Sequence, residues 1–135
     1  MKIWACTICW NEEKMLPYYL KHYEKICDKI IIYDNESTDN SREIIKAHPK
    51  TELRTCKTIN SLRDDIHIQI KEDIIYEAKN NADYIIIGDV DEFLYHVNIN
   101  LFIKNNYKFP FYYAAGYQMV SNKFPATDYQ IYDEC

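Results

Sequence analysis

The chain has 135 residues and a formal net charge of −5, with 47% hydrophobic and 27% charged residues. This length fits one domain, and the hydrophobic content is sufficient for a packed core, which excludes a disordered chain. The acidic balance disfavours a nucleic-acid-binding protein, which usually has a basic face. It allows a phosphate compound to bind through a divalent cation.

Strand-like and helix-like patterns alternate along most of the sequence. Apolar or β-branched runs predict strands at 2–8, 29–33, 51–58 and 82–87. Helical spacing predicts helices at 14–27, from Asp39 or Asn40 to His48, and along a stripe from Leu62 to Ala78. A short helix is expected at 98–105, and an aromatic strand at 109–120, at the other end of the sheet.

This alternation predicts an α/β fold, a Rossmann-type three-layer sandwich with a mostly parallel central sheet. The continuous apolar run at 82–87 is expected to be the clearest buried strand, covered on both faces. No apolar run is long enough to span a membrane, and no signal-peptide cleavage site follows the short apolar N-terminus.

The cysteines do not form a disulfide pattern. They are odd in number and scattered, at positions 6, 9, 27, 56 and 135. Cys6 and Cys9 have C-x-x-C spacing, but no second pair or nearby histidine follows, so buried thiols are the preferred interpretation. Free thiols are typical of an intracellular protein.

Polar residues follow three of the predicted strands. Asn11 and Glu12 come after the first, Asp34 and Asn35 end the second, and Asp89, Asp91 and Glu92 end the fourth. Ligands of open parallel sheets bind outside the carboxyl ends of the strands. We therefore expect these groups to converge at one edge of the sheet and to form a cleft.

Asp89 and Asp91 give the sharpest signal. Alternate residues of an extended backbone share a face, so both carboxylates could hold one Mg²⁺ or Mn²⁺ ion. Such an ion would neutralise a diphosphate leaving group. The alternative is a solvated turn or a structural salt-bridge cluster.

The other polar residues have structural alternatives too. Asp34 could bind a base or a sugar, or serve only as a turn residue. Taken alone, Asn11 and Glu12 are better explained as caps of the first helix. His22, His48 and His67 are expected on helix surfaces, and His96 follows the acidic motif.

Glycines are scarce, since only Gly88 and Gly116 are present. A dinucleotide-binding fingerprint or a P-loop needs several glycines after the first strand. Their lack counts against a dehydrogenase or an NTPase and weakens a sugar nucleotidyltransferase hypothesis. A phosphate would have to be met by a metal.

Three blocks of this sequence resemble the family two glycosyltransferases, in particular the bacterial branch with a D-x-D-E-F motif. They are the Trp-Asn-Glu-Glu and Met-Leu-Pro runs at 10–17, the Tyr-Asp-Asn-Glu-Ser-Thr-Asp run at 33–39, and residues 82–94. The resemblance covers roughly residues 2–95. It implies a GT-A fold, a nucleotide-diphosphate sugar donor, and Mn²⁺ or Mg²⁺.

The resemblance also implies roles for single residues. Asn11 and Glu12 would line the nucleoside pocket, Asp34 would contact the base with Asn35 beside it, Asp89 would lie near the ribose and metal, and Asp91 would bind the metal directly. Family two enzymes usually invert the anomeric centre, with a carboxylate base. Asp128, Asp133 and Glu134 are the candidates for that base.

The chain, residues 1–135, is therefore expected to be the nucleotide-sugar-binding part of a metal-dependent transferase that is truncated at its C-terminus. The acceptor would be a glycan or a lipid-linked sugar, as in polysaccharide biosynthesis. The protein would be cytoplasmic, with possible contact to the inner membrane face. Two alternatives stay open: a non-catalytic α/β binding module and a sugar nucleotidyltransferase.

Overall fold

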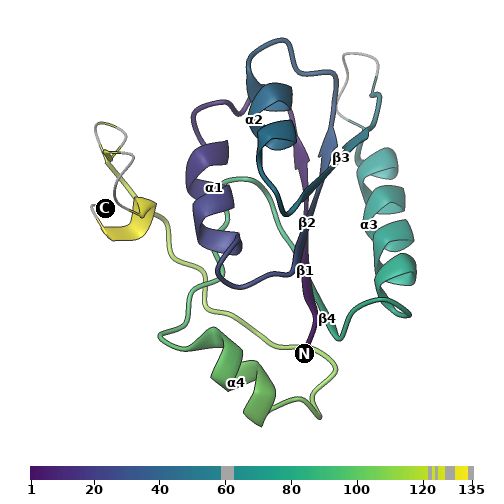
Figure 1. The fold of residues 1–135 in the computed structure, drawn as a ribbon, viewed down its shortest axis with the longest axis vertical. Helices are drawn as coiled ribbons and strands as arrows, with labels where there is room; N and C mark the ends of the chain where they lie inside the picture. Colours follow the sequence, from purple (N-terminus) through teal and green to yellow (C-terminus); the bar gives the residue numbers. More distant parts are fainter. Residues whose placement is uncertain (59–62, 122, 124, 127–129, 134–135) are drawn as a thin grey trace.

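The computed structural model describes residues 1–58, 63–121, 123, 125–126 and 130–133 (Figure 1). The strands are β1 (Ile3–Cys9), β2 (Lys29–Asp34), β3 (Thr51–Thr55) and β4 (Tyr84–Ile87). The helices are α1 (Leu16–Tyr23), α2 (Ser41–Ala47), α3 (Asp64–Ala78) and α4 (Ile99–Asn105), and a 3₁₀ turn, η1, covers Ile131–Asp133. The predicted order of strands and helices is confirmed up to α4. Leu62, expected in the third helix, lies outside the described residues.

The four strands form one parallel sheet in the order β3-β2-β1-β4. Cys9 pairs with Asp34 on β2, and Cys6 pairs with Ile87 on β4. Each strand is followed by a helix on the way to the next, as parallel pairing requires. The prediction of an α/β fold with a Rossmann-like, three-layer arrangement is confirmed.

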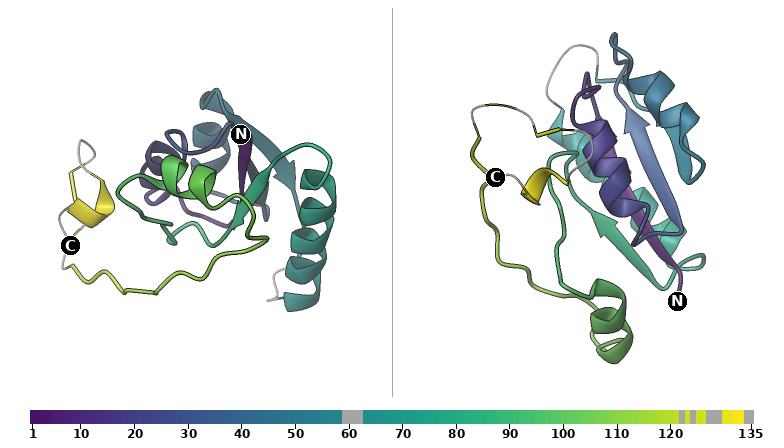
Figure 2. Two further views of the ribbon diagram at one scale, coloured as in Figure 1. Left: turned by 90° about the horizontal axis from the view of Figure 1, so that it is seen from below. Right: turned by 60° about the vertical axis from the view of Figure 1, so that its left-hand side comes forward.

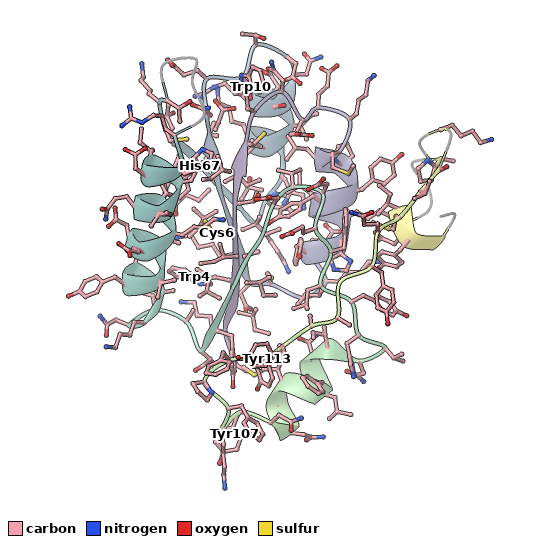
Figure 3. All side chains as sticks on the ribbon, turned by 180° about the vertical axis from the view of Figure 1, so that it is seen from behind. Trp4, Cys6, Trp10, His67, Tyr107 and Tyr113 are labelled. Atoms are coloured by element: carbon pink, nitrogen blue, oxygen red, sulfur yellow. The ribbon has the colours of Figure 1, made fainter. Side chains whose placement is uncertain are left out.

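Alternate residues of the central strands supply the two faces of the sheet. Ile3, Ala5, Ile30 and Ile32 pack under α1 and α2, whereas Trp4, Cys6 and Ile31 pack under α3. Figure 1 shows α1 and α2 on one side of the sheet and α3 on the other, and Figure 3 shows Trp4 and Cys6 between the sheet and α3. Burying one such isoleucine stabilises the fold by about 2 kcal/mol before the entropy cost.

The expectation that 82–87 is the clearest buried strand is wrong. β4 begins at Tyr84, and all four of its residues are half-buried. The reason is its place at the edge of the sheet, where β1 is its only neighbour among the described residues. The most buried strands are β1 and β2, which lie in the middle.

The predicted strand at 109–120 is also wrong, because no residue of this range pairs with a described strand. Tyr112 is held by Tyr84, whose hydroxyl lies 3.2 Å from its own, but Tyr113 is 94% exposed. Without a neighbouring ladder, alternating aromatic residues do not form a strand. Figure 2 shows this segment as an extended trace that leads from α4 towards η1.

Among the described helices, none has the length and apolar character needed to cross a membrane.

Candidate metal and nucleotide site

The carboxyl ends of all four strands lie at the same edge of the sheet, because the strands are parallel. Cys9 ends β1 directly beside Asp34, which ends β2, and Ile87 ends β4 on the other side of β1. The loops after these strands carry the residues predicted for the site. Their convergence at one edge is therefore confirmed. Trp10, 62% exposed, marks this end of the molecule in Figure 3.

Asp89 and Asp91 flank a buried residue on a turn. The Glu92 amide donates to the Asp89 carbonyl at 3.1 Å, so the backbone turns here and is not extended as the spacing suggested. Val90, only 4% exposed, packs in the core with α1 and α4. Both aspartates are exposed, so the turn presents two carboxylates to solvent while Val90 anchors it.

Glu92 closes this turn. Its Oε2 accepts from the Asp89 amide at 3.1 Å. A Cβ atom at Gly88 would come within 2.9 Å of that oxygen, so a side chain at position 88 would displace the Glu92 carboxylate. The single glycine of the motif thus allows the carboxylate to lie over the backbone.

The two aspartates and Glu92 line one cavity of about 740 Å³. Its other residues come mostly from the segment after α4, and they are Met15, Tyr117, Gln118, Met119, Val120, Ser121, Lys123, Pro125 and Ile131. Among the described lining residues, Lys123 is the only one with a positive charge. The sequence predicted a strand at 109–120 and did not place this wall at the site, since its irregular backbone leaves no periodic signal.

The carboxyl group of Glu12 lies close enough to this turn for the charge of Asp91 to affect its pKa. Burial raises the pKa of its carboxyl, and the negative charges of Asp91 and Asp39 raise it further. The ends of β1 and β4 therefore form one acidic region. Bringing these negative charges together favours the binding of a cation.

The backbone amides of residues 11–13 are all bound by the loop between β2 and α2 or by the first residue of α2. Asn11 N donates to Ser37 Oγ at 2.9 Å, Glu12 N to Ser41 Oγ at 2.9 Å, and Glu13 N to Asp39 Oδ2 at 3.0 Å. Each bond contributes about 1 kcal/mol. We call these three bonds the loop clasp, together with the bonds that the side chains of Asn11 and Glu13 accept from the loop between β2 and α2.

The returning bonds use the side chains of Asn11 and Glu13. Asn11 Oδ1 accepts from the Thr38 amide at 2.7 Å, and Glu13 Oε2 accepts from the Asn40 amide at 3.1 Å. Asn11 has φ 55°, a left-handed conformation that asparagine tolerates. The N-cap position of α1 is Met15, and it has no side-chain cap. The capping interpretation of Asn11 and Glu12 is therefore wrong.

Asp34 is fully buried, with no exposed surface. Its carboxylate forms an ion pair with Arg42 of α2 and accepts from the Ser37 amide at 3.3 Å. In this arrangement Asp34 stabilises the turn after β2. Its carboxylate is therefore not exposed to a base in this structure.

Asn35 is used in a similar way. Its Oδ1 accepts from the Thr58 amide at 3.1 Å and its Nδ2 donates to Thr58 Oγ1 at 2.8 Å. These bonds connect the turn after β2 to the chain that follows β3. The side chain thereby fixes the edge of the site on the β3 side.

The candidate bases lie near the end of the chain. Asp133 belongs to η1, two residues after the cavity-lining Ile131. Asp128 and Glu134 lie outside the described residues. His96, which follows the acidic motif, accepts from the Asn98 amide at 3.0 Å and packs on Phe102.

Among the residues that the structure describes, no three His, Cys, Asp or Glu side chains form a cluster that could by itself hold a metal ion. Mg²⁺ at phosphate-binding sites needs fewer than three protein ligands. It commonly takes one or two protein carboxylates and completes its octahedron with substrate phosphates and water. Asp89 and Asp91 fit this limited donor set.

Neither a protein-family model nor a curated protein matches this chain. The fold and the acidic edge define it as an α/β protein of Rossmann-like architecture with a candidate site at the carboxyl ends of its strands.

Proposed function

We propose that this chain binds a nucleoside-diphosphate sugar together with Mn²⁺ or Mg²⁺ and serves a glycosyltransferase. The observation that carries the proposal is the pair of exposed carboxylates, Asp89 and Asp91, at the carboxyl end of β4. They line one cavity, and Asp91 lies close enough to Glu12 to raise the pKa of its carboxyl.

The first loop of the chain supports a metal-based mode of phosphate binding. Proteins that bind phosphate without a metal often use free backbone amides after the first strand. Here the amides of residues 11–13 are bound to Ser37, Ser41 and Asp39. This arrangement disfavours a phosphate cradle in that loop and, with it, a sugar nucleotidyltransferase.

In the proposed reaction, a bound cation would stabilise the charge that develops on the diphosphate leaving group. Asp89 and Asp91 would hold this cation, and Asn11, Glu12, Asp34 and Asn35 would shape the nucleoside pocket. A carboxylate, for which Asp133 and Glu134 are our candidates, would remove the proton of the acceptor hydroxyl in an inverting displacement. The acceptor is a glycan or a lipid-linked sugar, and we place the reaction in the cytoplasm.

Calorimetric titration with UDP and GDP, with and without Mn²⁺, tests the proposal. We expect Mn²⁺-dependent binding that Asp91→Asn abolishes, because this substitution keeps the shape of the side chain and removes its charge. Glu72→Gln, an exposed position on α3, is the matched control and should bind like the original protein. Metal-independent binding, or no binding by folded protein, would contradict the proposal. The first result would favour a non-catalytic binding module.

A further inference from the structure

The last turn of α1 holds the backbone that follows the two aspartates. Tyr23, 2% exposed, donates from its hydroxyl to the Glu92 carbonyl at 2.9 Å. The same hydroxyl accepts from the Leu94 amide at 3.1 Å. One side chain thus satisfies two backbone groups of the chain directly after the turn at 89–92.

His22 adds a third bond to the same stretch. Its Nε2 lies 3.0 Å from the Leu94 carbonyl, which can only accept, so this nitrogen carries the hydrogen. Nδ1 then accepts from the Tyr132 hydroxyl at 3.2 Å. His22 is only 5% exposed, so the expectation of a surface position was wrong. Burial lowers its pKa, which favours the neutral ring that these bonds require.

Aromatic packing reinforces these bonds. The His22 ring meets Phe93 edge-on at 5.3 Å and Tyr132 edge-on at 5.5 Å. Phe93 lies between the two backbone groups that Tyr23 binds. The stretch from Glu92 to Leu94 is therefore fixed by both hydrogen bonds and ring contacts to α1.

Neither His22 nor Tyr23 is among the residues that line the cavity. The aspartates themselves are exposed, so the turn is fixed from the inside, by Val90 before Asp91 and by the bonds to Glu92 and Leu94 after it. A rotation of the backbone at Glu92 would move the carboxylate of Asp91 relative to that of Asp89.

We propose that Tyr23, assisted by His22, is a positioning residue that holds Asp89 and Asp91 in the geometry that binds a divalent cation. This inference rests on the proposed function. Residues that orient metal ligands without touching the metal typically change its affinity about 10- to 100-fold when they are removed. Tyr23 would act through the peptide groups of the turn.

Tyr23→Phe removes one oxygen atom and both hydrogen bonds but keeps the buried ring. Tyr84→Phe is the matched control, because Tyr84 begins β4, at the opposite end of the strand from the aspartates, and its hydroxyl donates to the Tyr107 carbonyl at 2.9 Å. The probe is Mn²⁺ itself, measured by the electron paramagnetic resonance of the free ion in the presence of UDP. We expect Tyr23→Phe to weaken Mn²⁺ binding about 10-fold or more and Tyr84→Phe to leave it unchanged.

Circular dichroism of the metal-free protein detects a general loosening of the fold. We expect the same spectrum for both variants and the original protein. Equal Mn²⁺ affinity in Tyr23→Phe and the original protein would overturn the inference, and so would equal weakening by both substitutions. If Tyr23→Phe does not fold, His22→Phe tests the same point, since it removes the bond to Leu94 and keeps a ring.

Amide hydrogen exchange separates this inference from the proposed function. Without metal, the Leu94 amide should exchange faster in Tyr23→Phe than in Tyr84→Phe, whether or not the protein binds a nucleotide. If the original protein shows no Mn²⁺-dependent binding, the proposed function fails and the positioning role fails with it. Faster exchange in Tyr23→Phe would then still show that the hydrogen bond from the Leu94 amide to Tyr23 protects this amide. Unchanged exchange at Leu94 would contradict the inference alone.

Discussion

Asp34 and Arg42 form an ion pair in which the carboxylate is fully buried and the side chain of the arginine is 31% exposed. Arg42→Ala would leave a buried charge without a partner, so we expect the free energy of unfolding to fall by about 3 kcal/mol. Urea denaturation at pH 7 measures this change. Lys46→Ala, on the same helix and exposed, is the control and should have little effect.

Combining Arg42→Ala with Asp34→Asn should recover part of the loss, because the buried group is then neutral. A double variant as unstable as the sum of both single variants would show that the two side chains do not interact in solution.

The loop clasp should weaken in acid. Burial raises the pKa of Asp39, but hydrogen bonds from Ser41 and from the Glu13 amide outweigh this effect, so the pKa of the carboxyl lies below its usual value. The folded-state pKa is therefore lower than the unfolded value of about 3.9. The stabilisation is fully present above the unfolded pKa and is lost as the pH falls through the folded one.

Asp39→Asn checks this pH dependence. The Asp39 carboxylate accepts from the backbone amides of Glu13 and Ser41. We expect the substitution to destabilise the protein by about 1 kcal/mol at pH 7, because one of these two amides loses its acceptor. The difference from the original protein should shrink below about pH 4, where Asp39 itself becomes neutral. Urea denaturation across this range measures it, and a difference that stays constant with pH would contradict the role of the charge.

Removing the charge of Asp91 should change the pKa of Glu12. Burial is the largest cause of the raised pKa of Glu12, and Asp91 is the next. Asp91→Asn should therefore lower this pKa, though not to its usual value, in metal-free protein. Carbon-13 NMR of the carboxyl group measures the titration, and Asp73→Asn on α3 serves as the control. No change would mean that the ends of β1 and β4 are not close.

The cysteines of the C-x-x-C spacing should be unreactive. Burial raises the pKa of Cys6 to about 12 and that of Cys9 to about 11, so neither is a thiolate at pH 8. Iodoacetamide should modify them only after unfolding in urea, as mass spectrometry can show. Burial likewise raises the pKa of Cys27 to about 12, which makes it an internal comparison. Rapid modification of Cys9 in folded protein would contradict this prediction.

The order of the helices and strands could be predicted from the sequence, and so could the position of the candidate site at the carboxyl ends of the strands. Two-residue and 3.6-residue periodicities are local signals, and parallel strands bring their ends together whatever their order. The position of a strand in the sheet is not a local property. The apolar run at 82–87 was therefore expected to be the clearest buried strand, although β4 lies at the edge of the sheet.

The contacts between loops could not be predicted either. Asn11 and Glu12 were expected to cap the first helix, but the Asn11 side chain binds Thr38 and the Glu12 amide binds Ser41, which lie 27 and 29 residues later. His22 looked like a surface residue because its partners, Leu94 and Tyr132, are 72 and 110 residues away. Such pairings depend on the fold itself, and no local spacing carries them.

The loop clasp also makes the first two loops one thermodynamic unit. An opening that frees the Asn11 side chain also breaks the bonds to Thr38, so the conformational entropy of both loops is released together. A nucleoside that immobilised only the first loop would thus reduce the motion of the second. Its affinity would include little additional ordering cost, because folding has already restricted both segments.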